Sequence, residues 1–131
     1  MANRIHHINF LVRELSSAIE HYVALLGCKP VIEELPARGV KSARFKVGES
    51  WIVLLQPTST TGAPAAHLRE HGEGFFMISY GCTDLDAKLQ ELSANGLSLS
   101  GQSPRQGLAN WRVRDVDNRY NVLTQFTEEL G

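Results

Sequence analysis

The sequence has no long hydrophobic run, almost no net charge and only two cysteines. No apolar stretch approaches the roughly 20 residues of a membrane-spanning helix, and the first residues lack the apolar core of a signal peptide. These two absences predict a cytoplasmic protein with no membrane partner. The formal net charge of −1 also argues against a nucleic-acid partner, because general binding to nucleic acid depends on a basic excess.

The two cysteines, Cys28 and Cys82, do not have CxxC spacing. In a cytoplasmic protein we expect them to be reduced, partly buried thiols. With 131 residues, of which 43% are hydrophobic and 21% charged, the chain is long enough to bury an ordinary core. We therefore predict a single domain over residues 1–131.

The chain contains an internal repeat. Residues 5–12 form a strand-like stretch, and a helical pattern follows over residues 15–26. About seventy residues later, a similar strand at residues 75–82 is followed by a helical pattern at residues 84–95. Each helical pattern ends before a glycine, Gly27 in the first copy and Gly96 in the second. This repetition indicates a tandem duplication.

Further strands complete each copy. We expect them at residues 28–35, 40–47 and 50–56 in the first copy, and at residues 97–99, 108–114 and 121–127 in the second. The sequence therefore predicts an α+β fold of two tandem βαβββ modules. The first spans about residues 4–57, a connector about 58–73 and the second module about 74–131. Placed side by side, the modules would form a curved eight-stranded sheet with helices outside and a central cup inside.

Strand alternation predicts which side chains line the cup. They are His7, Asn9, Trp51, Val53, Leu55, Phe75, Met77, Ser79, Leu123, Gln125 and Thr127. An apolar concavity with a few converging polar groups is the usual form of a small-molecule site, although the same residues could fill the cup as a second core. We take His7 as the catalytic candidate, because a partly desolvated neutral imidazole suits a general base. The ligand-binding candidates are Asn9, Trp51, Val53, Phe75, Met77, Ser79, Leu123 and Gln125.

Four stretches of the sequence resemble a known family. They are RIHHI at residues 4–8, EELP at 33–36, LLQP at 54–57 and HLREHGEG at 67–74. With the duplicated βαβββ pattern, they resemble the vicinal oxygen chelate superfamily, which contains glyoxalases, bleomycin-resistance proteins and dioxygenases. Within it, they are most similar to methylmalonyl-CoA epimerase. The resemblance implies the glyoxalase/bleomycin-resistance fold and a homodimer.

The resemblance also implies positions for a divalent metal. In this superfamily, four strands supply the ligands, typically His, Gln or Glu, His and Glu, and the ion stabilises an enolate as a Lewis acid. The matching positions here are His7, Val53, Met77 and Gln125. Valine cannot bind a metal, and the methionine thioether suits soft ions. We therefore expect no cofactor, and a divalent metal only if an altered site survives on His7 and Gln125.

Three hypotheses for function follow from the sequence. The first is a metal-independent isomerase or lyase that acts next to a carbonyl, with a small organic ligand in the cup. The second is an active metal-dependent methylmalonyl-CoA epimerase or lactoylglutathione lyase-like enzyme with altered ligands. The third is a non-catalytic, drug-sequestering protein of the bleomycin-resistance type. An anionic or acyl-CoA ligand would suit the basic residues Arg38, Lys41, Arg44, Arg105, Arg112, Arg114 and Arg119.

Overall fold

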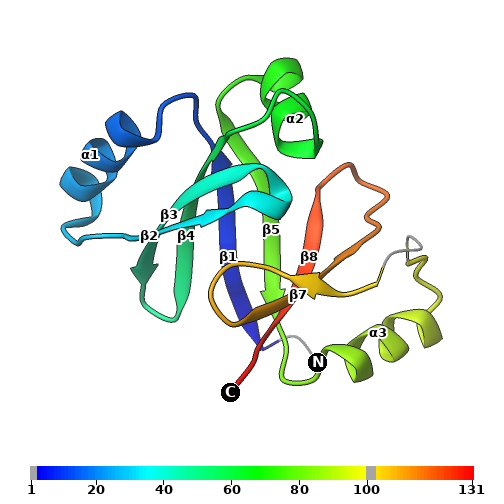
Figure 1. Ribbon diagram of the computed structural model, residues 1–131. Helices are drawn as coiled ribbons and strands as arrows, with labels where there is room; N and C mark the ends of the chain where they lie inside the picture. The colour runs from blue at the N-terminus through cyan, green and yellow to red at the C-terminus, as the bar shows by residue number, and fades with distance from the viewer. Residues whose placement is uncertain (1–2, 100–102) are drawn as a thin grey trace. The chain divides into compact units, whose positions relative to one another are not determined.

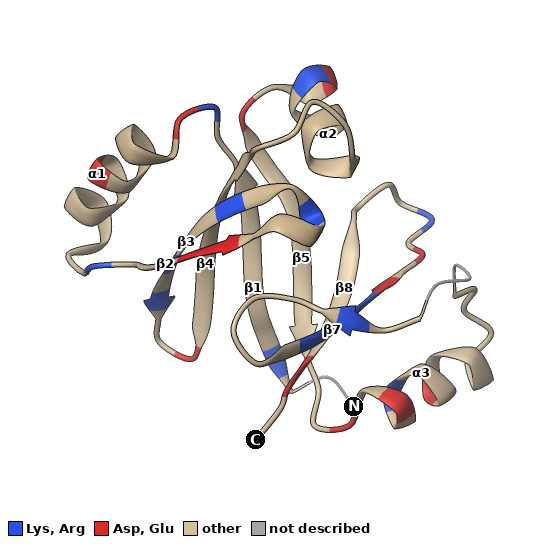
Figure 2. Ribbon diagram, in the orientation of Figure 1, with Lys and Arg blue, Asp and Glu red and all other residues tan. Residues whose placement is uncertain are grey.

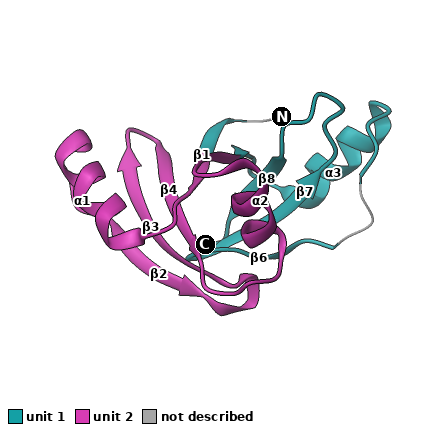
Figure 3. Cartoon of the chain, turned by 90° about the horizontal axis from the view of Figure 1, so that it is seen from above, with its two compact units in different colours: residues 1–6, 77–131 teal, residues 7–76 magenta. Residues whose placement is uncertain are grey.

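The structure, a computed structural model, describes residues 3–99 and 103–131. The chain folds into two compact units, shown in different colours in Figure 3. Unit 1 contains residues 1–6 and 77–131, and unit 2 contains residues 7–76. Each unit follows the order strand, helix and three strands (Figure 1). This order confirms the predicted α+β repeat.

Unit 2 contains four neighbouring strands in the order β2-β3-β4-β1, of which β1 belongs to this unit from His7 onward. Its strands are β1 (Arg4–Leu11), β2 (Val31–Leu35), β3 (Val40–Val47) and β4 (Ser50–Pro57). β1 runs parallel to β4, and the other pairs are antiparallel. β2 is shorter than predicted because it begins only after Pro30, which has no N–H group to donate. A short 3-10 turn (Pro36–Arg38) joins β2 to β3, and α2 (Ala63–His71) precedes β5 (Gly74–Gly81).

Helix α1 (Leu15–Leu26) packs on one face of this sheet. Leu15 meets the buried strand residues Ala43, Phe45 and Leu54, and the apolar stripe of the helix packs around them. The apolar positions recur with helical spacing, so one face of the helix is buried. Gly27 ends the helix at φ 72°, and its N–H donates to the Val23 carbonyl oxygen at 2.9 Å.

Helices α1 and α3 begin in the same way. In each, the N–H group of the first residue donates a hydrogen bond to a side chain on a strand. In unit 2, the Leu15 N–H donates to Gln56 Oε1 at 2.7 Å. In unit 1, the Leu85 N–H donates to Glu128 Oε1 at 2.8 Å. These bonds satisfy helix-terminal donors that have no partner within the helix. The duplication therefore preserves a specific tertiary contact as well as the order of elements.

Unit 1 contains a sheet in the order β5-β8-β7-β6. Its other elements are α3 (Leu85–Ala94), β6 (Arg105–Gln106), β7 (Trp111–Val116) and β8 (Thr124–Glu129). Cys82, Leu85 and Phe126 form the core beneath α3. Asp84 caps this helix, since its side chain accepts a hydrogen bond from the Ala87 N–H at 3.0 Å.

Some predicted boundaries in unit 1 are wrong. Residues 97–99 form no strand. The first strand after α3 is instead the short β6. β8 begins at Thr124 rather than at Asn121, whose positive φ of 63° is unsuited to a strand. Asp115, which follows the strand predicted at residues 108–114, lies within β7 opposite Gln125. This last difference matters for the candidate site.

Two expectations from composition can be compared with the fold. Both cysteines are free thiols, Cys28 partly buried and Cys82 buried. Burial, followed by the nearby Glu128 carboxylate, raises the pKa of the Cys82 thiol, which makes it a poor nucleophile. Within residues 3–99 and 103–131, no helix has the length and apolar character needed to cross a membrane.

Candidate functional site

The face of the unit 2 sheet opposite α1 contains four of the predicted site residues. Phe10, Ile52 and Leu54 pack toward α1, so their strand neighbours point to the other face. The parallel register places His7 beside Trp51, and Asn9 beside Val53. His7 is 3% exposed, Asn9 9% and Val53 0%. This face therefore combines a buried imidazole and amide with an apolar side chain and an indole ring.

Two cations flank the Trp51 ring. Arg44 Cζ lies 5.2 Å from the ring centroid, and Lys46 Nζ lies 4.9 Å from it. Arg44 also forms an ion pair of 2.7 Å with Glu33. Figure 2 shows basic segments along β3, the strand that carries Lys41, Arg44 and Lys46. Cation–π contacts hold a cation at an aromatic surface. The sequence indicated basic residues such as Lys41 and Arg44, but it did not place Arg44 and Lys46 beside Trp51.

The face of the unit 1 sheet opposite α3 contains three further predicted residues. Ser79 lies opposite Gln125 in the register of β5 and β8. Ser79 Oγ and Thr127 Oγ1 are hydrogen-bonded at 2.6 Å, and both side chains are buried. Met77 is 5% exposed and Gln125 4%. The centre of this face is therefore buried and polar.

Gln125 belongs to a hydrogen-bonded chain that the sequence did not predict. Its Nε2 donates to Asp115 Oδ1 at 3.2 Å. Asp115 in turn accepts from Arg105, with Nη1 to Oδ2 at 2.9 Å and Nη2 to Oδ1 at 3.3 Å. Gln125 Oε1 is buried and has no hydrogen-bond partner among the described residues. The sequence does not reveal the register between β7 and β8. That register places Asp115 directly opposite Gln125.

Two predicted residues lie in more exposed positions. Phe75 is 46% exposed, and its ring meets Phe10 edge-on at 6.4 Å. Leu123 is 43% exposed and precedes β8, although its carbonyl oxygen accepts from the Ile78 N–H at 3.1 Å. Contact of either residue with a ligand stays a prediction.

The side chains at the four positions matching the metal ligands do not fit a divalent ion. Val53 offers no donor atom, and Met77 offers only a soft thioether. His7 and Gln125 are neutral ligands, whereas a hard divalent ion is normally bound by at least one carboxylate. Within the described part of the chain, no group of three or more His, Cys, Asp or Glu residues could hold a metal.

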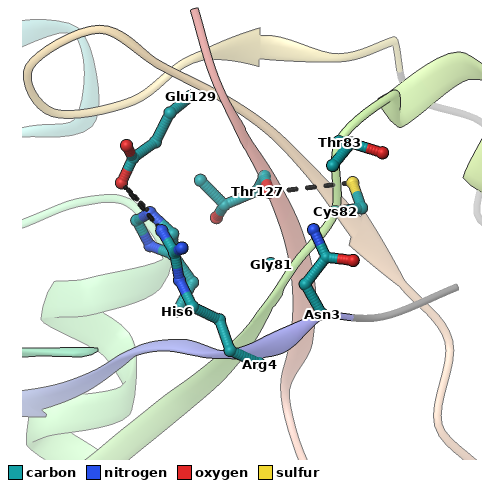
Figure 4. Close-up of a pocket in the computed structure, with 8 residues that line it drawn as sticks. All are labelled: Asn3, Arg4, His6, Gly81, Cys82, Thr83, Thr127 and Glu129. Atoms are coloured by element: carbon teal, nitrogen blue, oxygen red, sulfur yellow. Dashed lines mark hydrogen bonds and ion pairs between the residues drawn. The ribbon is translucent and has the colours of Figure 1, made fainter. Parts of the chain in front are cut away.

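Unit 1 also contains a small hollow of about 230 Å³ (Figure 4). Arg4 and His6 point toward Glu129, whose Oε1 accepts from Arg4 Nη2 at 3.1 Å and lies 2.7 Å from His6 Nε2. His6 is 1% exposed and packs edge-on against Trp111 at 4.6 Å. The hollow is smaller than the roughly 300 Å³ at which ligand pockets begin. We therefore interpret this cluster as structural.

Helix α2 contains a pair of histidines one turn apart. The rings of His67 and His71 lie 4.4 Å apart, and His67 packs edge-on against Phe76 at 4.9 Å. His67 Nδ1 is buried without a hydrogen-bond partner in the described structure. Burial, then the charge of His71, lowers the pKa of His67, and Glu70 partly opposes this. The neutral imidazole is therefore the form that the fold favours.

We predict that His67 makes the fold less stable in mild acid. A histidine with a lowered folded-state pKa binds more protons when unfolded, so stability falls as pH drops through the unfolded value of about 6.5. The free energy of unfolding, measured with urea at pH 7.5 and 5.5, is expected to fall less in His67→Phe than in the natural protein. His21→Phe, on the exposed part of α1, is the control. An equal loss in all three proteins would contradict the prediction.

Comparison with known proteins identifies the family. The family model for the glyoxalase/bleomycin resistance protein/dioxygenase superfamily matches residues 6–114. The chain belongs to this superfamily. The superfamily fold agrees with the predicted fold class and with the vicinal oxygen chelate resemblance.

Individual known proteins are similar to almost the whole chain. A variant of Streptomyces coelicolor methylmalonyl-CoA epimerase in complex with 2-nitronate-propionyl-CoA is 27% identical, with a TM-score of 0.92 over 100% of both chains. Hypothetical protein BH1468 from Bacillus halodurans C-125 is 30% identical, with a TM-score of 0.92 over 100% of this chain and 97% of its own. The uncharacterised protein YqjC of Bacillus subtilis (strain 168) is 27% identical over 98% of this chain and 94% of its own length.

Proposed function

We propose that this protein binds a small acyl-CoA-type ligand without a metal ion. The observation that carries the proposal is the full-length similarity to methylmalonyl-CoA epimerases, two of which are bound to 2-nitronate-propionyl-CoA and to methylmalonyl-CoA. The cations beside Trp51 support it, because the phosphates of CoA need positive partners. We further propose that the two units act as one cytoplasmic domain and that the protein is a homodimer.

The proposed absence of a metal rests on the residues at the four ligand positions. A divalent ion in this superfamily would stabilise an enolate, but Val53 and Met77 offer it no suitable donor. Chemistry next to a carbonyl would therefore depend on protein side chains. His7 is the best candidate for a base, because it is the imidazole buried on the face with Trp51 and Val53. In an isomerisation, it would remove the proton from the carbon next to the carbonyl and return it to a different atom of the resulting enolate.

A second candidate function is sequestration of an aromatic drug, as in bleomycin-resistance proteins. The presence of Trp51 beside His7 on this sheet favours it, because aromatic side chains pack against flat ligands. In that case, the drug would bind without being chemically changed. The remaining alternative is a metal-dependent epimerase or lactoylglutathione lyase-like enzyme built on His7 and Gln125.

A ligand screen combined with elemental analysis tests the proposal. In a thermal-shift screen of acyl-CoAs, 2-oxo acids and hydrophobic antibiotics, an acyl-CoA is expected to stabilise the fold by about 2.7 kcal/mol at 100 times its Kd. Protein purified without a His-tag is expected to contain no stoichiometric divalent metal. Stabilisation only by antibiotics would favour sequestration.

A variant with the superfamily's usual metal ligands provides the control for the elemental analysis. Val53→Gln, Met77→His and Gln125→Glu together restore the donor types that members of the superfamily typically use. This variant is expected to retain a divalent ion that the natural sequence does not. Stoichiometric metal in the natural protein would overturn metal independence and support the altered-ligand enzyme.

A further inference from the structure

We propose that Gln125 Oε1 selects ligands that carry a hydrogen-bond donor, so that hydroxyacyl-CoA thioesters bind better than the same thioesters without the hydroxyl group. Asp115 and Arg105 are the positioning residues that aim this oxygen. The inference deepens the proposed function and depends on it. It concerns the sheet face of unit 1 opposite α3, where β7 and β8 pair.

The orientation of the Gln125 amide follows from the chemistry of its partner. Asp115 is held by two bonds from Arg105, at 2.9 and 3.3 Å. An ionised carboxylate can only accept hydrogen bonds. The amide nitrogen must therefore face Asp115, as the 3.2 Å bond to Oδ1 shows. The carbonyl oxygen is consequently directed away from Asp115.

That oxygen is buried and unsatisfied. The Gln125 side chain is 4% exposed, and Oε1 has no hydrogen-bond partner among the described residues. The nearby hydroxyls of Ser79 and Thr127 are bonded to each other at 2.6 Å. A buried acceptor without a donor is unfavourable. A donor supplied by a ligand would satisfy it, and this requirement is the basis of selection.

The chemistry of this acceptor defines the ligand class. A hydroxyl or an N–H group on the ligand gains a hydrogen bond at Oε1. A ligand carboxylate gains nothing there, since it would meet a second oxygen that offers no proton. A glutamate at this position would instead hold a cation. The substitution by glutamine, fixed through Asp115, therefore changes the site from one suited to a metal into one suited to a neutral donor.

Matched pairs of thioesters test the inference. By isothermal titration calorimetry, lactoyl-CoA is expected to bind about 10-fold more tightly than propionyl-CoA, and 3-hydroxybutyryl-CoA more tightly than butyryl-CoA. In Gln125→Met, which keeps the length of the side chain without the amide, the preference is expected to disappear, so that the two members of each pair bind equally. Gln90→Leu, on the exposed surface of α3, is the control and should keep the preference.

Asp115→Asn tests the positioning role separately. An asparagine can present either its oxygen or its nitrogen to Gln125, so both orientations of the Gln125 amide become allowed. The preference for the hydroxyacyl ligand should then shrink while propionyl-CoA binding remains. This variant preserves the shape of the side chain, so it also covers the case in which Gln125→Met fails to fold.

The outcomes separate the two proposals. Equal affinity for both members of each pair in the natural protein, or an unchanged preference in Gln125→Met, would overturn the selection by Gln125 and leave acyl-CoA binding intact. An unchanged preference in Asp115→Asn would overturn the positioning role of Asp115. If none of the four thioesters binds, the proposed function itself is wrong, and the inference is wrong with it.

Discussion

Replacing Phe45 by alanine is expected to lower the free energy of unfolding by about 3–5 kcal/mol. Phe45 is 0% exposed and lies in the cluster with Leu15, Ala43 and Leu54. Its ring is also 5.9 Å from that of Tyr22 on α1. The substitution removes a large apolar side chain and leaves a cavity that the strand and helix backbones cannot close. Urea unfolding followed by circular dichroism measures the effect.

Phe75→Ala is the matched control for this prediction. It makes the same chemical change at a side chain that is 46% exposed, so the expected loss is within about 1 kcal/mol. If both variants lose the same stability, the Phe45 cluster is not the centre of the unit 2 core. A fall in the denaturant midpoint without a change in the slope m would show that the effect is on stability rather than on the unfolded state.

Replacing His7 by alanine is expected to slow proton exchange next to the thioester carbonyl by about 10²- to 10⁴-fold. His7 is 3% exposed and lies beside Trp51 in the register of β1 and β4. In the proposed function His7 is the base, so the substitution removes the group that would accept the proton. Exchange of the carbon-bound proton of propionyl-CoA with deuterium oxide, followed by NMR, measures the rate directly.

Two further measurements distinguish the roles of His7. The affinity of the His7→Ala variant for propionyl-CoA is expected to change far less than the rate, because a base acts in the transition state. His21→Ala, at an exposed position on α1, should retain the natural rate. Unchanged exchange in His7→Ala would exclude this residue as the base. Binding without any exchange in the natural protein would favour the sequestering function.

The periodic parts of the fold could be predicted from the sequence. The repeat of residues 5–26 about seventy positions later fixed the order of elements, because strand and helix spacings are local properties of the chain. The limits of β3 were predicted correctly, since its apolar pattern ends at Gly48. The boundaries in residues 97–127 were less accurate, because the strands there are short and flanked by polar loops.

The sequence by itself determined the superfamily and the duplicated architecture. It also predicted, through the resemblance, that His7, Val53, Met77 and Gln125 match the superfamily's metal ligands. Only the tertiary structure decided that Asp115 lies opposite Gln125, with Arg105 beside it, and that Arg44 and Lys46 flank Trp51. Motifs and alternation are encoded locally, so they can be read along the chain. Register between strands distant in sequence depends on how the whole sheet packs, and that register sets which polar groups meet.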